Sequence, residues 1–112
     1  MRVTSEFFVS ALIRRVFSSG GFAAIEHRGA AEAGAIFVRL RARDGRETLY
    51  GPAPQAFFEQ DTAGDRHFEV RLADAAAGDV EAILARERKF DSDLWVVELE
   101  QDALGDLVVV TP

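Results

Sequence analysis

The chain has 112 residues, of which 48% are hydrophobic and 29% charged, and its formal net charge is −6. This length and composition predict one folded domain spanning residues 1–112 and exclude a disordered chain. The acidic charge argues against nucleic acid as the main partner, and the absence of cysteine excludes disulfides, thiolate nucleophiles and thiolate metal sites.

The first predicted element is an amphipathic helix from Thr4 to Ser19. Its apolar side chains recur at helical spacing, Thr4 suits the N-cap, and two glycines follow Ser19 as a stop. Glu6 precedes the apolar stretch and Arg14 follows it, which is the reverse of the charge order in a signal peptide. No run of residues is long enough to span a membrane. We therefore expect a cytoplasmic protein without a membrane segment.

Two segments in the first half predict a β-hairpin after a short strand at residues 22–28. The sequence "AIFVRLRA" (35–42) alternates, so one face carries apolar residues and the other carries arginines together with Phe37. The first set is Ile36, Val38, Leu40 and Ala42, and the second is Phe37, Arg39, Arg41 and Arg43. Asp44-Gly45 predicts a two-residue loop that leads into residues 46–52. This register pairs Leu40 with Leu49 and Arg39 with Tyr50, which would place Arg39 and Tyr50 on the same outward face.

The second half predicts a strand, a helix and a further strand. "HFEVRL" (67–72) alternates with Phe68, Val70 and Leu72 inward, a helix runs from Gly78 to Phe90, and "DLWVVELE" (93–100) alternates again. The predicted fold class is therefore α+β. We expect two layers, namely a mainly antiparallel sheet of about four to five strands with two helices on one face.

The outward face of this sheet carries the candidate binding residues Arg39, Arg41, Tyr50 and Arg71. Arginine and tyrosine are enriched at binding hot spots, and arginine suits acidic partners or phosphates. In the alternative interpretation, carboxylates on neighbouring strands neutralise these arginines as cross-strand ion pairs. The carboxylates in position to do so are Glu69, Glu98, Glu100 and Asp102.

Residues suited to catalysis or to metal binding are few. The two histidines, His27 and His67, belong to no spaced pair, and His67 is expected on the solvent face of its strand. The acidic segment 59–65 fails the spacing of a calcium loop. We predict no catalytic residue, no metal site and no cofactor. A small enzyme that uses His67 with Glu69 or Asp65 stays open as a hypothesis.

Four segments resemble a family of small proteobacterial proteins of unknown function: "TSEFFVSALIRRVFSSGGFAAIEHRG", "EAGAIFVRLR", "DGRETLYGPAPQ" and "RERKFDSDLWVVELE". The resemblance covers nearly the whole chain. It implies a bacterial cytoplasmic protein, and it brings no activity, ligand or catalytic residue with it.

The first functional hypothesis is a non-enzymatic protein-binding or adaptor domain. We expect it to form a homodimer, because the helices already have full buried stripes without Phe7, Phe57, Phe58 and Trp95. Some of these four residues complete the core, and those left outside would form an association surface, since exposed apolar patches mark interfaces. The alternative hypothesis is a nucleic-acid or phosphometabolite binder, in which Arg39, Arg41, Arg43 and Arg71 contact phosphates.

Overall fold

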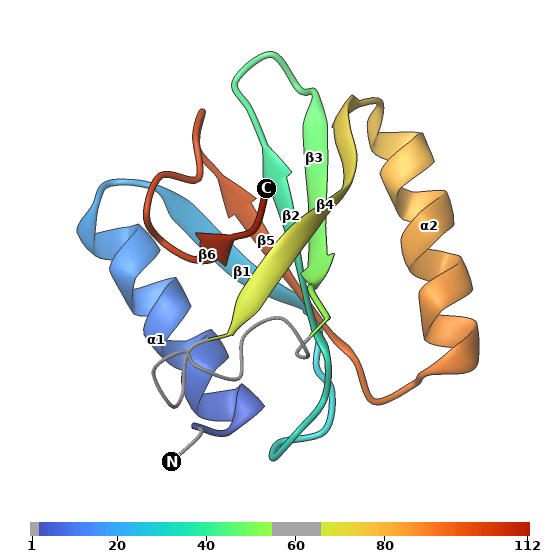
Figure 1. Ribbon diagram of the computed structural model, residues 1–112. Coiled ribbons are helices and arrows are strands. Elements are labelled where there is room, and N and C mark those ends of the chain that lie inside the picture. Colours follow the sequence, from blue (N-terminus) through green and yellow to red (C-terminus); the bar gives the residue numbers. More distant parts are fainter. Residues whose placement is uncertain (1–2, 55–65) are drawn as a thin grey trace.

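The structure, a computed structural model, describes residues 3–54 and 66–112 (Figure 1). Within these residues the chain forms a six-stranded mixed sheet in the order β1-β5-β2-β3-β4-β6 and two long helices. The parallel neighbours are β2 with β5 and β4 with β6, and the other pairs are antiparallel. The elements are α1 (Ser5–Ser18), β1 (Phe22–His27), β2 (Ile36–Arg41), β3 (Glu47–Pro52), β4 (His67–Ala75), α2 (Ala77–Phe90), β5 (Trp95–Glu100) and β6 (Val109–Val110).

The α+β fold class is confirmed, but the placement of both helices on one face is wrong. Figure 1 shows α1 and α2 on opposite sides of the sheet, so the fold has three layers. The α1 side holds a buried cluster built from α1, Phe68 and the inward residues of β2 and β5. On the other side, α2 packs through Val80 and Leu84 on Phe37 and Val96. The sheet can bury both faces because β2 and β5 carry apolar residues on both of them.

The β2–β3 hairpin is confirmed, but its register differs from the predicted one by one residue. Arg39 pairs with Leu49, and Val38 pairs with Tyr50. The loop contains three residues instead of two, and its last residue, Gly45, has a φ of 88°. Glycine adopts this left-handed conformation without steric cost, as three-residue hairpin loops require. A shift of one residue moves every side chain of β3 to the opposite face.

Two residues of β4 differ in burial from what the alternation of the strand predicts. Val70 of β4, expected inside, is 47% exposed. The pairing of β4 with β3 shifts register around this position, and α1 packs mainly against β1 instead. His67, expected on the solvent face, is buried at the start of β4. Strand alternation assumes a regular ladder and one covered face, and neither condition holds for β4.

The connection between β1 and β2 passes very close to the start of β5, which leads to a prediction about stability. A Cβ atom at Gly29 would clash with the carbonyl oxygens of Asp93 and Leu94. Gly29→Ala is therefore expected to lower the free energy of unfolding by about 1–3 kcal/mol, because backbone atoms cannot move aside cheaply. Gly78→Ala is the matched control, since a Cβ there meets nothing within 4 Å and favours the helix. Urea denaturation of both variants measures the difference, and equal stabilities would contradict the prediction.

Candidate functional site

The candidate site lies on the side of the sheet that faces α2. The helix packs on β3 and β4 and also covers Phe37 of β2 and Val96 of β5, whereas β1 and the later residues of β2 and β5 extend beyond it. We call this uncovered part the open face. Pairing register places its outward residues side by side, because Ala24 lies opposite Glu98, which in turn lies beside Arg39. The residues of the open face are Ala24, Glu26, Arg41, Glu98 and Glu100.

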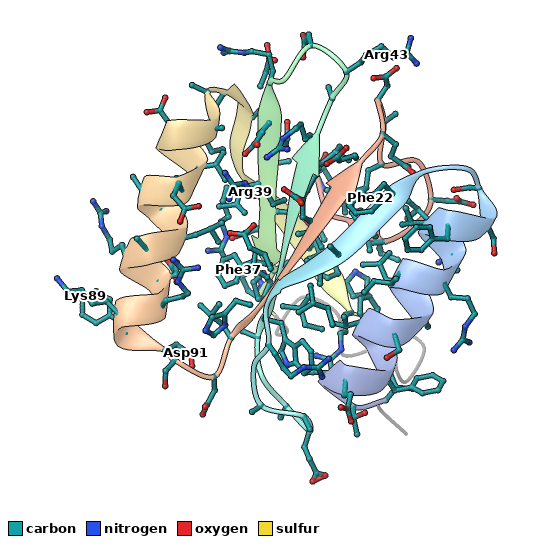
Figure 2. All side chains as sticks on the ribbon, turned by 180° about the vertical axis from the view of Figure 1, so that it is seen from behind. Phe22, Phe37, Arg39, Arg43, Lys89 and Asp91 are labelled. Atoms are coloured by element: carbon teal, nitrogen blue, oxygen red, sulfur yellow. The ribbon has the colours of Figure 1, made fainter. Side chains whose placement is uncertain are left out.

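Arg39 lies beneath the edge of α2, and Figure 2 shows it on the side of the sheet that faces this helix. Arg39 as a whole is only 7% exposed. The Nε atom donates to Glu47 at 2.7 Å, and Nη1 donates to Glu81 at 2.8 Å and to Glu26 at 3.1 Å. The remaining nitrogen, Nη2, donates to the carbonyl oxygen of Ala77 at 3.3 Å. One guanidinium thus joins β1, β3 and α2 to β2.

These partners stabilise the positively charged form of Arg39. Burial by itself lowers the pKa of Arg39, but hydrogen bonds to Glu47 and Glu81 and the nearby charge of Glu26 outweigh it and leave the pKa above its ordinary value. A guanidinium stays protonated even when it is buried, so carboxylates must compensate the hydration that it loses. Each of the three nitrogens of the Arg39 guanidinium therefore donates a hydrogen bond within the folded protein.

Glu47 connects Arg39 to the second arginine of β2. Its side chain is fully buried, and its other carboxylate oxygen accepts a hydrogen bond from Arg41 Nε at 2.9 Å. Arg41 then reaches outward to Glu98 at 3.2 Å and to Glu100 at 3.7 Å. Its pKa is raised mainly by the hydrogen bond to Glu47. Both arginines of β2 therefore bind carboxylates of the same chain.

The resulting network carries more negative than positive charge. Arg88 of α2 extends it through Glu81, at 3.4 Å. Among the residues that these ion pairs join, three arginines face five glutamates, a net charge of −2. Glu81 and Glu100 have the most exposed side chains, at 46% each, while Arg41 is 37% exposed and Glu98 23%. The network is therefore acidic overall, although Arg41 also reaches solvent between the carboxylates.

Of the four residues predicted for a binding site, the structure joins only two in one network. Arg39 and Arg41 are linked through Glu47. Tyr50 lies on the opposite face of the sheet, packed against the α1-side cluster, and burial raises the pKa of its hydroxyl. Its predicted place beside the arginines is wrong, because it depended on the two-residue loop.

Arg71 makes separate contacts on the α2 side. Its guanidinium lies over the ring of Phe37 at 5.4 Å, forms an ion pair with Glu69 at 3.1 Å and donates to the Pro52 carbonyl at 2.7 Å. Glu69 does neutralise this arginine, but the pair lies within β4 and is not the predicted cross-strand pair. These contacts stabilise the β3–β4 pair, and none of them connects Arg71 to the open face.

Sequence reasoning missed the three carboxylates that bind Arg39, namely Glu26, Glu47 and Glu81. A three-residue loop would have revealed Glu47, because this register places it opposite Arg41. The other two come from β1 and α2, and no local pattern links them to β2. The predicted ion pairs of Glu98 and Glu100 are present on Arg41, and Asp102 forms one with Arg43 at 3.2 Å.

The remaining candidates do not form a second site within the described residues. His27 Nδ1 lies 2.8 Å from the carbonyl oxygen of Leu94, far along the chain. No cluster of three potential metal ligands occurs in residues 3–54 and 66–112, and the acidic segment 59–65 lies outside them. Neither helix of the described part is long and apolar enough to cross a membrane.

The four apolar side chains considered for the core or for an association surface lie in different places. Trp95 is 1% exposed and belongs to the α1-side core, so it is one of those that complete the core. Phe7 is exposed on α1, and Phe57 and Phe58 lie outside the described residues. Other exposed rings, Phe17 and Phe22, contact each other edge to face with centroids 5.8 Å apart.

Comparisons with known proteins place this fold among bacterial proteins. A family model described as "Protein of unknown function (DUF1491)" matches residues 3–109. The solution structure of protein Atu0922 from A. tumefaciens is 60% identical, with a TM-score of 0.86 over 100% of this chain and 98% of that one. A crystal structure of a DUF1491 family protein from Caulobacter crescentus is 28% identical, with a TM-score of 0.80 over 99% of this chain and 100% of the other. A search of curated proteins gave no match.

Proposed function

Because the chain belongs to the DUF1491 family of proteins of unknown function, we propose its role from its own surface: a non-enzymatic protein-binding domain whose open face binds a basic segment of a partner. The observation that carries this proposal is the negative net charge of the network. Arg39 and Arg41 already bind carboxylates, while Glu26, Glu98 and Glu100 lie on the open face with side chains 25%, 23% and 46% exposed. The net charge of −6 attracts cationic partners over longer distances.

The same geometry gives little support to a binder of nucleic acid or phosphometabolites. A phosphate on Arg39 or Arg41 would have to displace carboxylates from them and then lie beside Glu26, Glu98 and Glu100. Like charges in direct contact oppose binding, and the counterion release that drives nucleic-acid binding needs unpaired cations. A cationic ligand meets neither obstacle.

We expect neutralisation of Glu26, Glu98 and Glu100 by glutamine to weaken binding of a basic peptide by about tenfold. Each partly exposed ion pair contributes about 0.2–1 kcal/mol, and the losses at separate sites add. The matched control replaces Glu6 and Glu32 with glutamine and Asp106 with asparagine. These three exposed carboxylates lie on the α1 side, so the control changes net charge equally.

Calorimetric titration of both triple variants with an arginine-rich peptide at low and physiological salt measures this effect. Equal weakening by both variants would show that only overall charge matters and would contradict the proposed site. Salt-sensitive retention of the wild type on heparin would favour the phosphate alternative instead.

Self-association and location form two further proposals. A homodimer would cover Phe7 and Phe17, which are 61% and 52% exposed on α1; light scattering across a concentration series tests it. A location in the bacterial cytoplasm is the second of these proposals, and it follows the bacterial origin of the similar structures. Cell fractionation tests this location.

A further inference from the structure

The two edges of the sheet differ in how well they are protected against pairing with another strand. On the β4 side, β6 pairs with His67 and Phe68, and the ladder between β3 and β4 shifts register at two places. Asp74 near the end of β4 has a φ of 48°, an uncommon backbone conformation outside glycine. Such irregularities bend an edge strand and make the addition of a further strand difficult.

The β1 edge carries no such protection along most of its length. Residues Phe22, Ala23, Ala24 and Ile25 pair with β5 in unbroken register, and the irregularity begins only between Ile25 and His27. Within the described residues, β5 is the only strand hydrogen-bonded to β1. The stretch contains no lysine and no proline, and two of its residues are alanines, whose small side chains leave the backbone accessible.

The side chains beside this edge define what an added strand would meet. On the α2 side, β1 presents Ala24 and Glu26, and the next strand presents Glu98 and Glu100. An added strand would lie about 4.8 Å from β1, with every second side chain on this same face. Long cationic side chains at those positions would lie beside Glu26 and extend toward Glu98.

We propose that β1 receives an extended segment of a partner protein, with basic residues at alternate positions, as a seventh strand of the sheet. This inference rests on the proposed function, since it assigns a binding mode to the same open face. Charge complementarity selects the occupant. A second copy of this chain would bring an identical set of carboxylates against Glu26, Glu98 and Glu100, and like charges oppose that contact.

A peptide of about ten residues, the usual upper length of a strand, tests the binding mode. Arginine alternates with valine in the parent peptide. Two analogues carry N-methyl groups, one on every arginine and one on every valine. Alternate backbone N–H groups of a strand point in opposite directions, so each analogue blocks one edge while charge and side chains stay the same. Fluorescence anisotropy gives the three affinities.

We expect one analogue to bind at least about tenfold more weakly than the parent and the other to bind like the parent, because several backbone hydrogen bonds are lost in only one of them. In a ¹⁵N–¹H correlation spectrum, the parent peptide should shift the amides from Phe22 to Ile25 most. This pattern requires strand pairing, since a purely electrostatic contact does not distinguish the two analogues.

The other outcomes separate the two proposals. If both analogues bind like the parent while the Glu26, Glu98 and Glu100 triple variant binds weakly, strand addition is wrong and the acidic open face stands. If the parent peptide does not bind, or binds that variant as tightly as the wild type, the proposed function fails as well. A concentration-dependent dimer whose amide shifts centre on β1 would identify a second copy as the occupant and overturn the choice of a basic partner.

Discussion

Replacement of Glu47 by glutamine is expected to lower the free energy of unfolding by about 3–5 kcal/mol, the usual cost of removing one partner from a buried ion pair. The side chain of Glu47 is fully buried between Arg39 and Arg41 and accepts hydrogen bonds of 2.7 and 2.9 Å from them. Glutamine has the same shape but no charge, and its amide group cannot accept from both guanidiniums. Arg39 would stay buried with less compensation.

Urea denaturation followed by circular dichroism measures the effect, with Glu100→Gln as the control. The Glu100 side chain is 46% exposed and lies 3.7 Å from Arg41, so its loss should cost less than about 1 kcal/mol. Equal stabilities of the two variants would mean that Glu47 contributes no more than a surface glutamate. The network would then not be the element that holds β2, β3 and α2 together.

Replacement of Trp95 by alanine should have an effect of similar size, about 3–5 kcal/mol, since it removes the largest side chain of the α1-side core. The residue is 1% exposed, its indole N–H donates to the carbonyl oxygen of Ala30 at 2.8 Å, and Arg28 lies 5.1 Å from the ring centroid. Truncation leaves a cavity and removes the indole's hydrogen bond to Ala30.

Circular dichroism is the suitable probe for this variant, because Trp95 is the only tryptophan and its fluorescence is lost with it. Phe90→Ala serves as the control for the loss of an aromatic ring, since Phe90 is 85% exposed at the end of α2. We expect that control to remain within about 0.5 kcal/mol of the wild type. A Trp95→Ala protein as stable as the Phe90→Ala protein would contradict the assignment of Trp95 to the core.

The elements themselves could be predicted from sequence because their signals are local. Thr4 caps α1 by accepting a hydrogen bond from the Phe7 amide, and alternation located β2, β4 and β5. The placement of the two helices on opposite faces of the sheet depends on contacts between distant parts of the chain, which local patterns do not reveal. Phe37 and Val96 were assigned to an outward face, although two apolar residues there were the available sign that a second helix covers it.

The site was predictable only to the extent that it lies on one strand. Arg39 and Arg41 share a face of β2 by simple alternation, and this part of the prediction is confirmed. The position of Tyr50 depended on counting loop residues, and an error of one residue reversed its face. Glu26 and Glu81 reach Arg39 through tertiary packing, which has no counterpart in the spacing of the sequence.

The place of β5 in the sheet has a consequence for how the protein forms during synthesis. The strands β1 and β2 follow each other in the chain, but β5 lies between them and pairs with both. The ribosome must therefore release residues 95–100 before either strand gains this neighbour. Contacts that join distant parts of a chain form slowly, because a long loop has to close first. Until then the apolar β1 and β2 segments emerge without their partner, and we expect them to depend on chaperones at this stage.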